Sequence, residues 1–285
     1  ISQRSEDFAA WPVLGDKKVD GMKFFGTFSA GLKTARDAWC YAPTHSQVEA
    51  NMQVLIDTYE SARAAFPQWA TTHGIQSPRE ADVNEFLALN PEYADLSKIS
   101  WNRSLKNLLA KNQGIEFQTR HTTNSLYRPF AASSVYFDRP VNDMVYQMPS
   151  MFPTPQHTNI GMIMTGPAAM YQYTCIATNL LPNLHTLHTG QYFPRFTWDK
   201  VDAPEGELNF GTAGTEKHSE SSRFGEIGEI VDGYRRVDNI TDEIKKRYRE
   251  ALGDDVTGDD IFHYVYGQLH DPKYRETYEA DLKKM

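Results

Sequence analysis

Short runs of β-branched and aromatic residues fill the middle of the chain: Ile115-Glu-Phe-Gln-Thr119, Ser134-Val-Tyr-Phe-Asp138, Ile160-Gly-Met-Ile-Met164, Tyr171-Gln-Tyr-Thr-Cys-Ile176 and Gln191-Tyr-Phe-Pro-Arg-Phe196. Proline, glycine and asparagine stand between these runs, as they stand between the strands of a sheet. The Pro-rich stretch 148–155 is expected to be a loop. Residues 114–200 therefore predict a β-rich lobe.

Helical patterns lie on both sides of this lobe. Ser46 and Glu49 form a capping-box pair, which predicts a helix that begins there and ends at Pro67. Further helices are predicted over residues 78–90, 100–112, 241–252, 257–269 and 271–282. The expected fold class is α+β, with N-terminal helices, a β-rich middle and a C-terminal helical segment.

Four segments follow from this pattern. Residues 1–113 are expected to form a mainly helical connector lobe, 114–200 the β-rich lobe, 201–239 a polar loop or linker, and 240–285 C-terminal helices that pack on the core. The sequence contains no internal repeat.

Composition limits the class of protein. The chain has 285 residues, of which 40% are hydrophobic, so it can bury a sizeable core. It shows neither a run of about 20 apolar residues nor a signal peptide. Cys40 and Cys175 are too few for a disulfide framework or a thiolate zinc site, and a cytoplasmic location is expected. Because residue 1 is Ile, we expect a piece of a longer polypeptide.

Charge is distributed unevenly. The formal net charge is −8, which argues against a nonspecific nucleic-acid binder. Residues 98–140 are the exception, with 7 Lys and Arg against 2 Asp and Glu. Such a segment is most often an ordinary solvated face.

Several catalytic signatures are absent from the sequence. There is no phosphate loop, no dinucleotide-binding glycine motif, no nucleophile elbow and no Asn-Pro-Pro-aromatic string. His185 and His188 are three residues apart, and His121, His157 and Cys175 are the available third ligands. This set lacks the glutamate of a recognisable zinc motif, so hydrogen-bonded loop histidines are the favoured interpretation.

The basic segment suggests another function. Arg103, Lys106 and Lys111 belong to a predicted helix, and Arg120, Tyr127, Arg128, Tyr136 and Arg139 belong to the strand region after it. Interleaved Arg and Tyr on a sheet suit phosphate contacts, guanine recognition and base stacking.

An ordered series of strings resembles one family, the single-polypeptide restriction–modification enzymes of type ISP and related putative helicases. The strings are Gly31-Leu-Lys-Thr-Ala-Arg-Asp-Ala-Trp39, Tyr127-Arg-Pro-Phe130, Tyr136-Phe-Asp-Arg139, Phe152-Pro-Thr-Pro155, Leu184-His185, Gly190-Gln-Tyr-Phe-Pro194, Asp260–His270 and Pro272–Tyr278. The block around His188 departs from the family, in which a glycine is expected.

The resemblance implies a C-terminal, noncatalytic DNA target-recognition region. The parent would combine a nuclease, an ATP-driven translocase or helicase and an adenine methyltransferase, and would use ATP, Mg and S-adenosylmethionine outside this segment. Expected partners are double-stranded DNA and the methyltransferase and helicase domains, with no membrane. Residues 114–200 would be the DNA-binding lobe.

Candidate DNA contacts follow from this implication. The candidate phosphate contacts are Arg103, Lys106, Lys111 and Arg120, the candidate base readers are Arg128, Arg139, Gln156, Gln191 and Arg195, and Tyr127 accompanies them. Two alternatives remain open at this point. One is a structural coupling module that touches no DNA, and the other is a metal hydrolase that uses His185 and His188.

Overall fold

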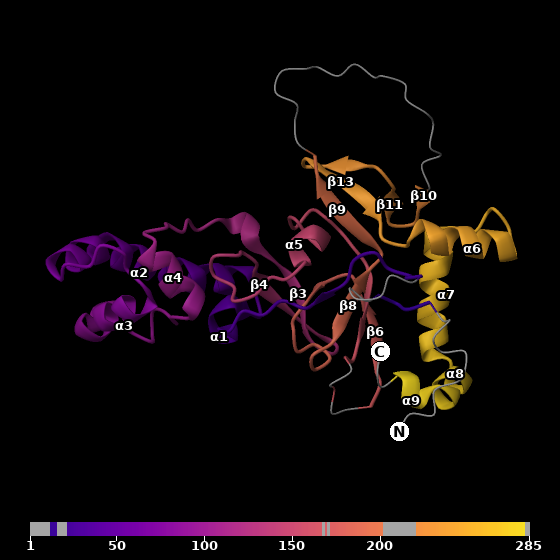
Figure 1. The fold of residues 1–285 in the computed structure, drawn as a ribbon, viewed down its shortest axis with the longest axis horizontal. Helices are drawn as coiled ribbons and strands as arrows, with labels where there is room; N and C mark the ends of the chain where they lie inside the picture. The colour runs from indigo at the N-terminus through magenta and orange to yellow at the C-terminus, as the bar shows by residue number, and fades with distance from the viewer. Residues whose placement is uncertain (1–11, 16–21, 167–168, 170–171, 202–220, 283–285) are drawn as a thin grey trace, which may run out of the picture. The chain divides into compact units, whose positions relative to one another are not determined.

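The computed structural model describes residues 12–15, 22–166, 169, 172–201 and 221–282 (Figure 1). The chain forms two compact units. Unit 1 comprises residues 1–31 and 146–285, and unit 2 comprises residues 32–145. Helices and sheets occur in both units, which confirms the predicted α+β class. None of the helices in the described ranges is both long and apolar enough to cross a membrane.

Unit 2 is built on one long helix and a small antiparallel sheet. Its elements are α1 (Asp37–Cys40), β2 (Tyr41–Ala42), α2 (His45–Thr72), α3 (Glu80–Leu89), the 3-10 turns η2 (Pro91–Tyr93) and η3 (Thr119–His121), α4 (Arg103–Ala110), β3 (Thr122–Arg128) and β4 (Ala131–Tyr136). Strand β4 pairs with both β2 and β3. Helix α2 contacts β2, β3 and β4, and it also packs on α3 and α4.

The long helix α2 differs at both ends from its sequence-based prediction. Its N-cap is Thr44, whose hydroxyl accepts a hydrogen bond from the Gln47 amide at 3.3 Å. Pro67 lies inside the helix, which continues to Thr72. The predicted strand over 115–119 is also wrong, because this stretch is irregular up to η3, and the longer strand β3 follows it.

Unit 1 contains sheets covered by the C-terminal helices. Its elements are β1 (Ser29–Ala30), α5 (Met148–Met151), β5 (Gly161–Met164), β6 (Cys175–Thr178), β7 (Leu181–Pro182), β8 (Gln191–Pro194), β9 (Phe196–Lys200), β10 (Ser221–Ser222), β11 (Gly225–Glu226), β12 (Ile230–Val231), β13 (Tyr234–Asp238), α6 (Asp242–Leu252), α7 (Gly258–His270), α8 (Pro272–Thr277) and α9 (Glu279–Leu282).

Pairing in unit 1 joins segments distant in sequence. One antiparallel sheet has the order β1-β8-β5-β6, and another has the order β12-β13-β9. The core between the first sheet and the C-terminal helices contains Phe25, Met162, Phe193, Ile244 and Phe262. In the predicted linker 201–239, residues 202–220 lie outside the described residues. Strands β10 to β13 occupy much of residues 221–238, which are therefore not a linker.

Candidate nucleic-acid interface

The β3–β4 hairpin of unit 2 carries most of the basic candidates. Its register runs from Thr122 opposite Tyr136 to Arg128 opposite Ala131, with an irregularity after Leu126. A strand of this length spans roughly 20 Å. Arg120 and Arg139 flank the first pair, whereas Arg128 is at the turn, so the structure separates Arg128 from the other two arginines along the hairpin.

Arg120 and Arg139 lie at the open end of this hairpin. The Phe137 amide donates to the His121 carbonyl at 2.7 Å, which continues the pairing one step beyond the strands. His121 Nδ1 also lies 3.4 Å from Asp138 Oδ2, close enough for an ion pair when the imidazole is protonated. Arg120 and Arg139 are exposed, and neither forms an ion pair with a carboxylate in the described ranges. Both guanidinium groups are therefore available to an external anion.

Tyr127 and Arg128, near the turn, interact with their own unit. The Tyr127 hydroxyl donates to Asp37 Oδ2 at 3.1 Å. Burial, together with the charge of Asp37, raises the pKa of Tyr127 above its usual value. The Arg128 guanidinium lies 3.9 Å from the centroid of the Tyr127 ring, and its Nη1 donates to the Tyr127 carbonyl at 2.7 Å. The Tyr127 ring thus already carries the Arg128 cation on its face, and its hydroxyl already contacts the Asp37 carboxylate.

The next group of candidates is on α4. Asn102 caps this helix by accepting from the Leu105 amide at 2.9 Å, and Leu105 and Leu109 are its buried side. Arg103 is exposed at the first turn, and Lys106 follows one turn later on the same side. Arg103 Nε is 3.9 Å from Glu80 Oε2, at the limit of an exposed pair that contributes little.

Lys111 is the C-cap residue of α4, and it is exposed. It follows Arg103 and Lys106 in sequence but lies at the opposite end of the helix from Arg103. The positive charges of Arg103, Lys106 and Lys111 are therefore spread along α4 from its first turn to its C-cap.

Two glutamine candidates belong to unit 1. Gln156 is exposed in the loop after α5, where its Oε1 accepts from the Thr154 hydroxyl at 2.7 Å. Gln191 is half-buried at the start of β8, opposite Ala30 of β1 and Met164 of β5. Both remain candidate base contacts.

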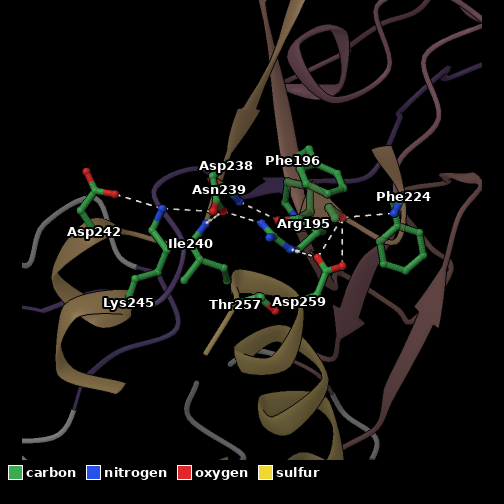
Figure 2. A network of polar contacts seen from close by, with 12 residues as sticks. Arg195, Phe196, Phe224, Asp238, Asn239, Ile240, Asp242, Lys245, Thr257 and Asp259 are labelled. Carbon is green, nitrogen blue, oxygen red and sulfur yellow. Dashed lines mark hydrogen bonds and ion pairs between the residues drawn. The ribbon is translucent and has the colours of Figure 1, made fainter. Parts of the chain in front are cut away.

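Arg195 was predicted to read bases, and the structure corrects this prediction. It has 0% exposed surface. Its guanidinium pairs with Asp238 through Nη1 and with Asp259 through Nε at 2.8 Å (Figure 2). Two carboxylates neutralise the single positive charge, so Arg195 is a structural residue of unit 1.

The same network joins β13, α6 and α7 of unit 1. Lys245 of α6 lies 3.1 Å from Asp238 Oδ2, and the backbone amide of Arg223 donates to Asp259 Oδ2 at 2.8 Å. Burial acts to lower the pKa of Lys245, but Asp238 and Asp242 outweigh it and leave that pKa raised. A Cβ at Gly258 would lie 2.3 Å from Arg195 Nη2, so the guanidinium requires glycine there.

The histidine alternative gains no support from the geometry. His185 is exposed in the turn after β7, and His188 is in the same turn with φ at 56°. Within the described part of the chain, no group of three or more His, Cys, Asp or Glu side chains could hold a metal ion.

One exposed side chain of the hairpin was not selected by the basic pattern. Phe130, in the turn between β3 and β4, is 92% exposed. The available signal was Pro129 between two β-like runs, because proline favours the first central position of a tight turn.

These features define an α+β chain with a basic hairpin and helix on an otherwise acidic sequence. The chain belongs to the family of Type ISP C-terminal specificity domains, whose family model matches residues 23–285. None of the curated proteins matches the sequence.

Solved structures that share the fold include three DNA complexes. One is the cryo-EM structure of a DrdV–DNA complex, with 24% identity, a TM-score of 0.68 and coverage of 94% of this chain and 22% of that chain. Another is a nuclease-deletion mutant of the Type ISP restriction-modification enzyme LlaGI in complex with a DNA substrate mimic, with 24% identity, a TM-score of 0.71 and coverage of 99% and 21%.

A third structure is that of the ATP-dependent Type ISP restriction-modification enzyme LlaBIII bound to DNA. It has 23% identity and a TM-score of 0.71, and the match covers 99% of this chain and 15% of that chain. The chain therefore spans only about a fifth of the length of the structures that it matches, and at these identities the likeness shows the fold.

Proposed function

We propose that this chain is the DNA target-recognition part of a larger restriction–modification polypeptide and performs no catalysis itself. The observation that carries the proposal is the family match over residues 23–285, because it identifies the chain as a specificity domain. Structures of the same fold are titled as complexes with DNA, which supports duplex DNA as the partner.

The parent polypeptide would supply the other activities. A translocase or helicase, a nuclease and an adenine methyltransferase would bind ATP, Mg and S-adenosylmethionine outside this chain. We place this polypeptide in the cytoplasm, where its DNA substrate is found. The noncatalytic chain would then contribute sequence specificity to methylation and to ATP-dependent restriction.

Basic residues of unit 2 provide the phosphate contacts in this proposal. Arg120 and Arg139 share the open end of the hairpin, and Arg103, Lys106 and Lys111 extend along α4. Contacts of this kind position a protein on DNA without reading its sequence. The exposed Gln156 and half-buried Gln191 of unit 1 remain candidates for base recognition.

The experiment is a titration of a labelled random-sequence duplex at about 50 to 200 mM salt. We expect the double variant Arg120→Ala/Arg139→Ala to bind more weakly and to lower the salt dependence of log K by about two, close to one per lost phosphate contact. Arg247→Ala is the matched control, because Arg247 is exposed on α6 of unit 1.

Equal binding by the wild-type chain and the double variant would remove the hairpin's open end from the interface. If the wild-type chain itself bound no DNA at the lower salt concentration, the coupling-module alternative would take precedence.

A further inference from the structure

The turn that joins β3 and β4 holds an aromatic ring in solvent. Arg128 pairs with Ala131, so Pro129 and Phe130 form the whole turn. Phe130 is 92% exposed, the most exposed of the large hydrophobic residues in the described ranges. The ring is in contact with almost none of the described residues, so packing inside unit 2 does not explain it.

The backbone at Phe130 adopts an uncommon conformation. Phe130 has φ at 62°, in the left-handed region that bulky residues rarely adopt. Pro129 restricts its own φ to about −65°, which suits the position before a left-handed residue in a tight turn. The turn therefore holds Phe130 in an uncommon conformation at the tip of a paired hairpin. Such outliers concentrate at functional positions.

The surroundings of the ring favour a polyanion. Residues 117–137 contain Arg120 and Arg128 but no Asp or Glu. The Arg128 guanidinium is held beside the turn against the Tyr127 ring, which keeps positive charge near the tip. The carboxylates that border the hairpin contact its own groups, since Asp37 accepts from the Tyr127 hydroxyl and Asp138 lies 3.4 Å from His121 Nδ1.

The shape of the tip favours DNA over a protein surface. Ala131 and Ala132, which follow Phe130, are exposed and small. A protein-docking patch normally offers several contiguous apolar side chains around its centre, whereas this tip offers a single projecting ring. A single ring on a narrow support matches the space between two base pairs, into which Phe side chains of other proteins insert as wedges.

We infer that Phe130 is a wedge that inserts between adjacent base pairs of the DNA bound by this chain, with Arg128 beside it facing the phosphate backbone. The inference rests on the proposed function. It deepens that function, because it gives the chain a means of deforming the duplex in addition to contacting it. Insertion unstacks one base step, so the bound DNA is locally unwound.

Two measurements on the full 285-residue chain test the inference. In the first, relaxed closed-circular plasmid is incubated with the protein and topoisomerase I, and the linking number is read after protein removal. In the second, affinity for a random-sequence duplex is measured at about 50 mM salt. We expect the wild-type chain to lower the linking number, so that the plasmid is negatively supercoiled after protein removal. Phe130→Ala should abolish this change and weaken binding about 5- to 100-fold, as for loss of one base-stacking aromatic.

The matched control is Leu96→Ala, since Leu96 is another exposed apolar residue of unit 2, at 81%. It should leave both measurements unchanged. Tryptophan fluorescence gives a direct readout of insertion. The fluorescence that Phe130→Trp adds should be quenched when DNA bases stack on the new indole, whereas the fluorescence that Leu96→Trp adds should persist in the presence of DNA. Because Phe130 contacts almost none of the described residues, its variants should melt at the wild-type temperature.

The outcomes separate the two ideas. If Phe130→Ala unwinds plasmid and binds as the wild-type chain does, while Arg120→Ala/Arg139→Ala still weakens binding, the wedge is refuted and DNA recognition stands. Weaker binding with no unwinding by the wild-type chain also refutes insertion, since the ring would then contact DNA only from outside. Absence of DNA binding by the wild-type chain removes the proposed function and the wedge together.

Discussion

Arg195 and Arg36 are both buried, and their surroundings differ in charge. Arg195 meets Asp238 and Asp259, while the side-chain nitrogens of Arg36 have no hydrogen-bond partner among the described residues. Burial lowers the pKa of Arg36, and the nearby Asp143 carboxylate only partly opposes this. The two arginines therefore predict opposite responses to the same substitution.

We expect Arg195→Met to destabilise the chain by about 3 to 5 kcal/mol, because it leaves the buried Asp259 without its cation and Asp238 with Lys245 alone. Arg36→Met should stabilise it by about 1 to 3 kcal/mol, since it removes an unsatisfied buried group and keeps a similar volume. Urea unfolding of both variants gives the measurement. A loss of stability in Arg36→Met would mean that the guanidinium has a stabilising partner.

The two thiols predict how stability depends on pH. Burial raises the pKa values of Cys40 and Cys175 to about 12. Above about pH 9 the unfolded chain releases these protons, whereas the folded chain retains them. The free energy of unfolding should then fall between about pH 9 and 10 by up to about 1 kcal/mol per thiol.

The check is urea unfolding at a series of pH values, compared with the double variant Cys40→Ala/Cys175→Ala. The variant should show a shallower decline, whatever its starting stability. Equal slopes would assign the alkaline loss to other groups.

Elements were predicted best where local pattern and packing agree. The apolar periodicity of α2 indicated its buried face correctly, including Val48, Met52 and Phe66. Its end was wrong because Pro67 is a local signal, whereas tertiary packing continues the helix. Phe86 of α3 lies 5.2 Å from the Phe66 ring and 5.5 Å from the Trp69 ring, on either side of the proline. Strand β3 was missed because Thr122-Thr-Asn-Ser125 is polar and becomes a strand through pairing with β4.

Pro67 makes the stability of α2 testable. A proline inside a helix removes one backbone hydrogen bond and crowds the preceding turn. We expect Pro67→Ala to raise the free energy of unfolding by about 1 to 3 kcal/mol. Ala70→Gly tests the opposite direction in the same turn and should lower it by about 1 kcal/mol or more. No gain in Pro67→Ala would show that packing of Phe66 and Trp69 depends on the proline-containing geometry.

The pairing of segments that are far apart in the chain could not be predicted from local sequence patterns. β1 pairs with β8, and Asn239 hydrogen-bonds to the Thr27 backbone across 212 positions. The sequence pattern predicted that the N-terminal residues belong to the same lobe as α2. In the structure, residues 22–31 instead complete the core of unit 1. The candidate site was predictable in part for a similar reason: the basic segment was visible in the sequence, but the burial of Arg195 depends on Asp238 and Asp259.

A substitution at Phe25 tests whether units 1 and 2 unfold independently. It is fully buried in the core of unit 1, against Phe193 at 5.5 Å and Phe262 at 6.2 Å between ring centroids. Phe25→Ala should cost about 3 to 5 kcal/mol, and the cost should be confined to one unit. Hydrogen exchange of the variant should therefore show faster exchange in β5, β8 and α7, while amides of α2 and β4 keep their protection. Equal loss of protection in α2 would show that the units unfold as one cooperative body, because damage in the core of unit 1 would then reach a helix whose own packing is intact.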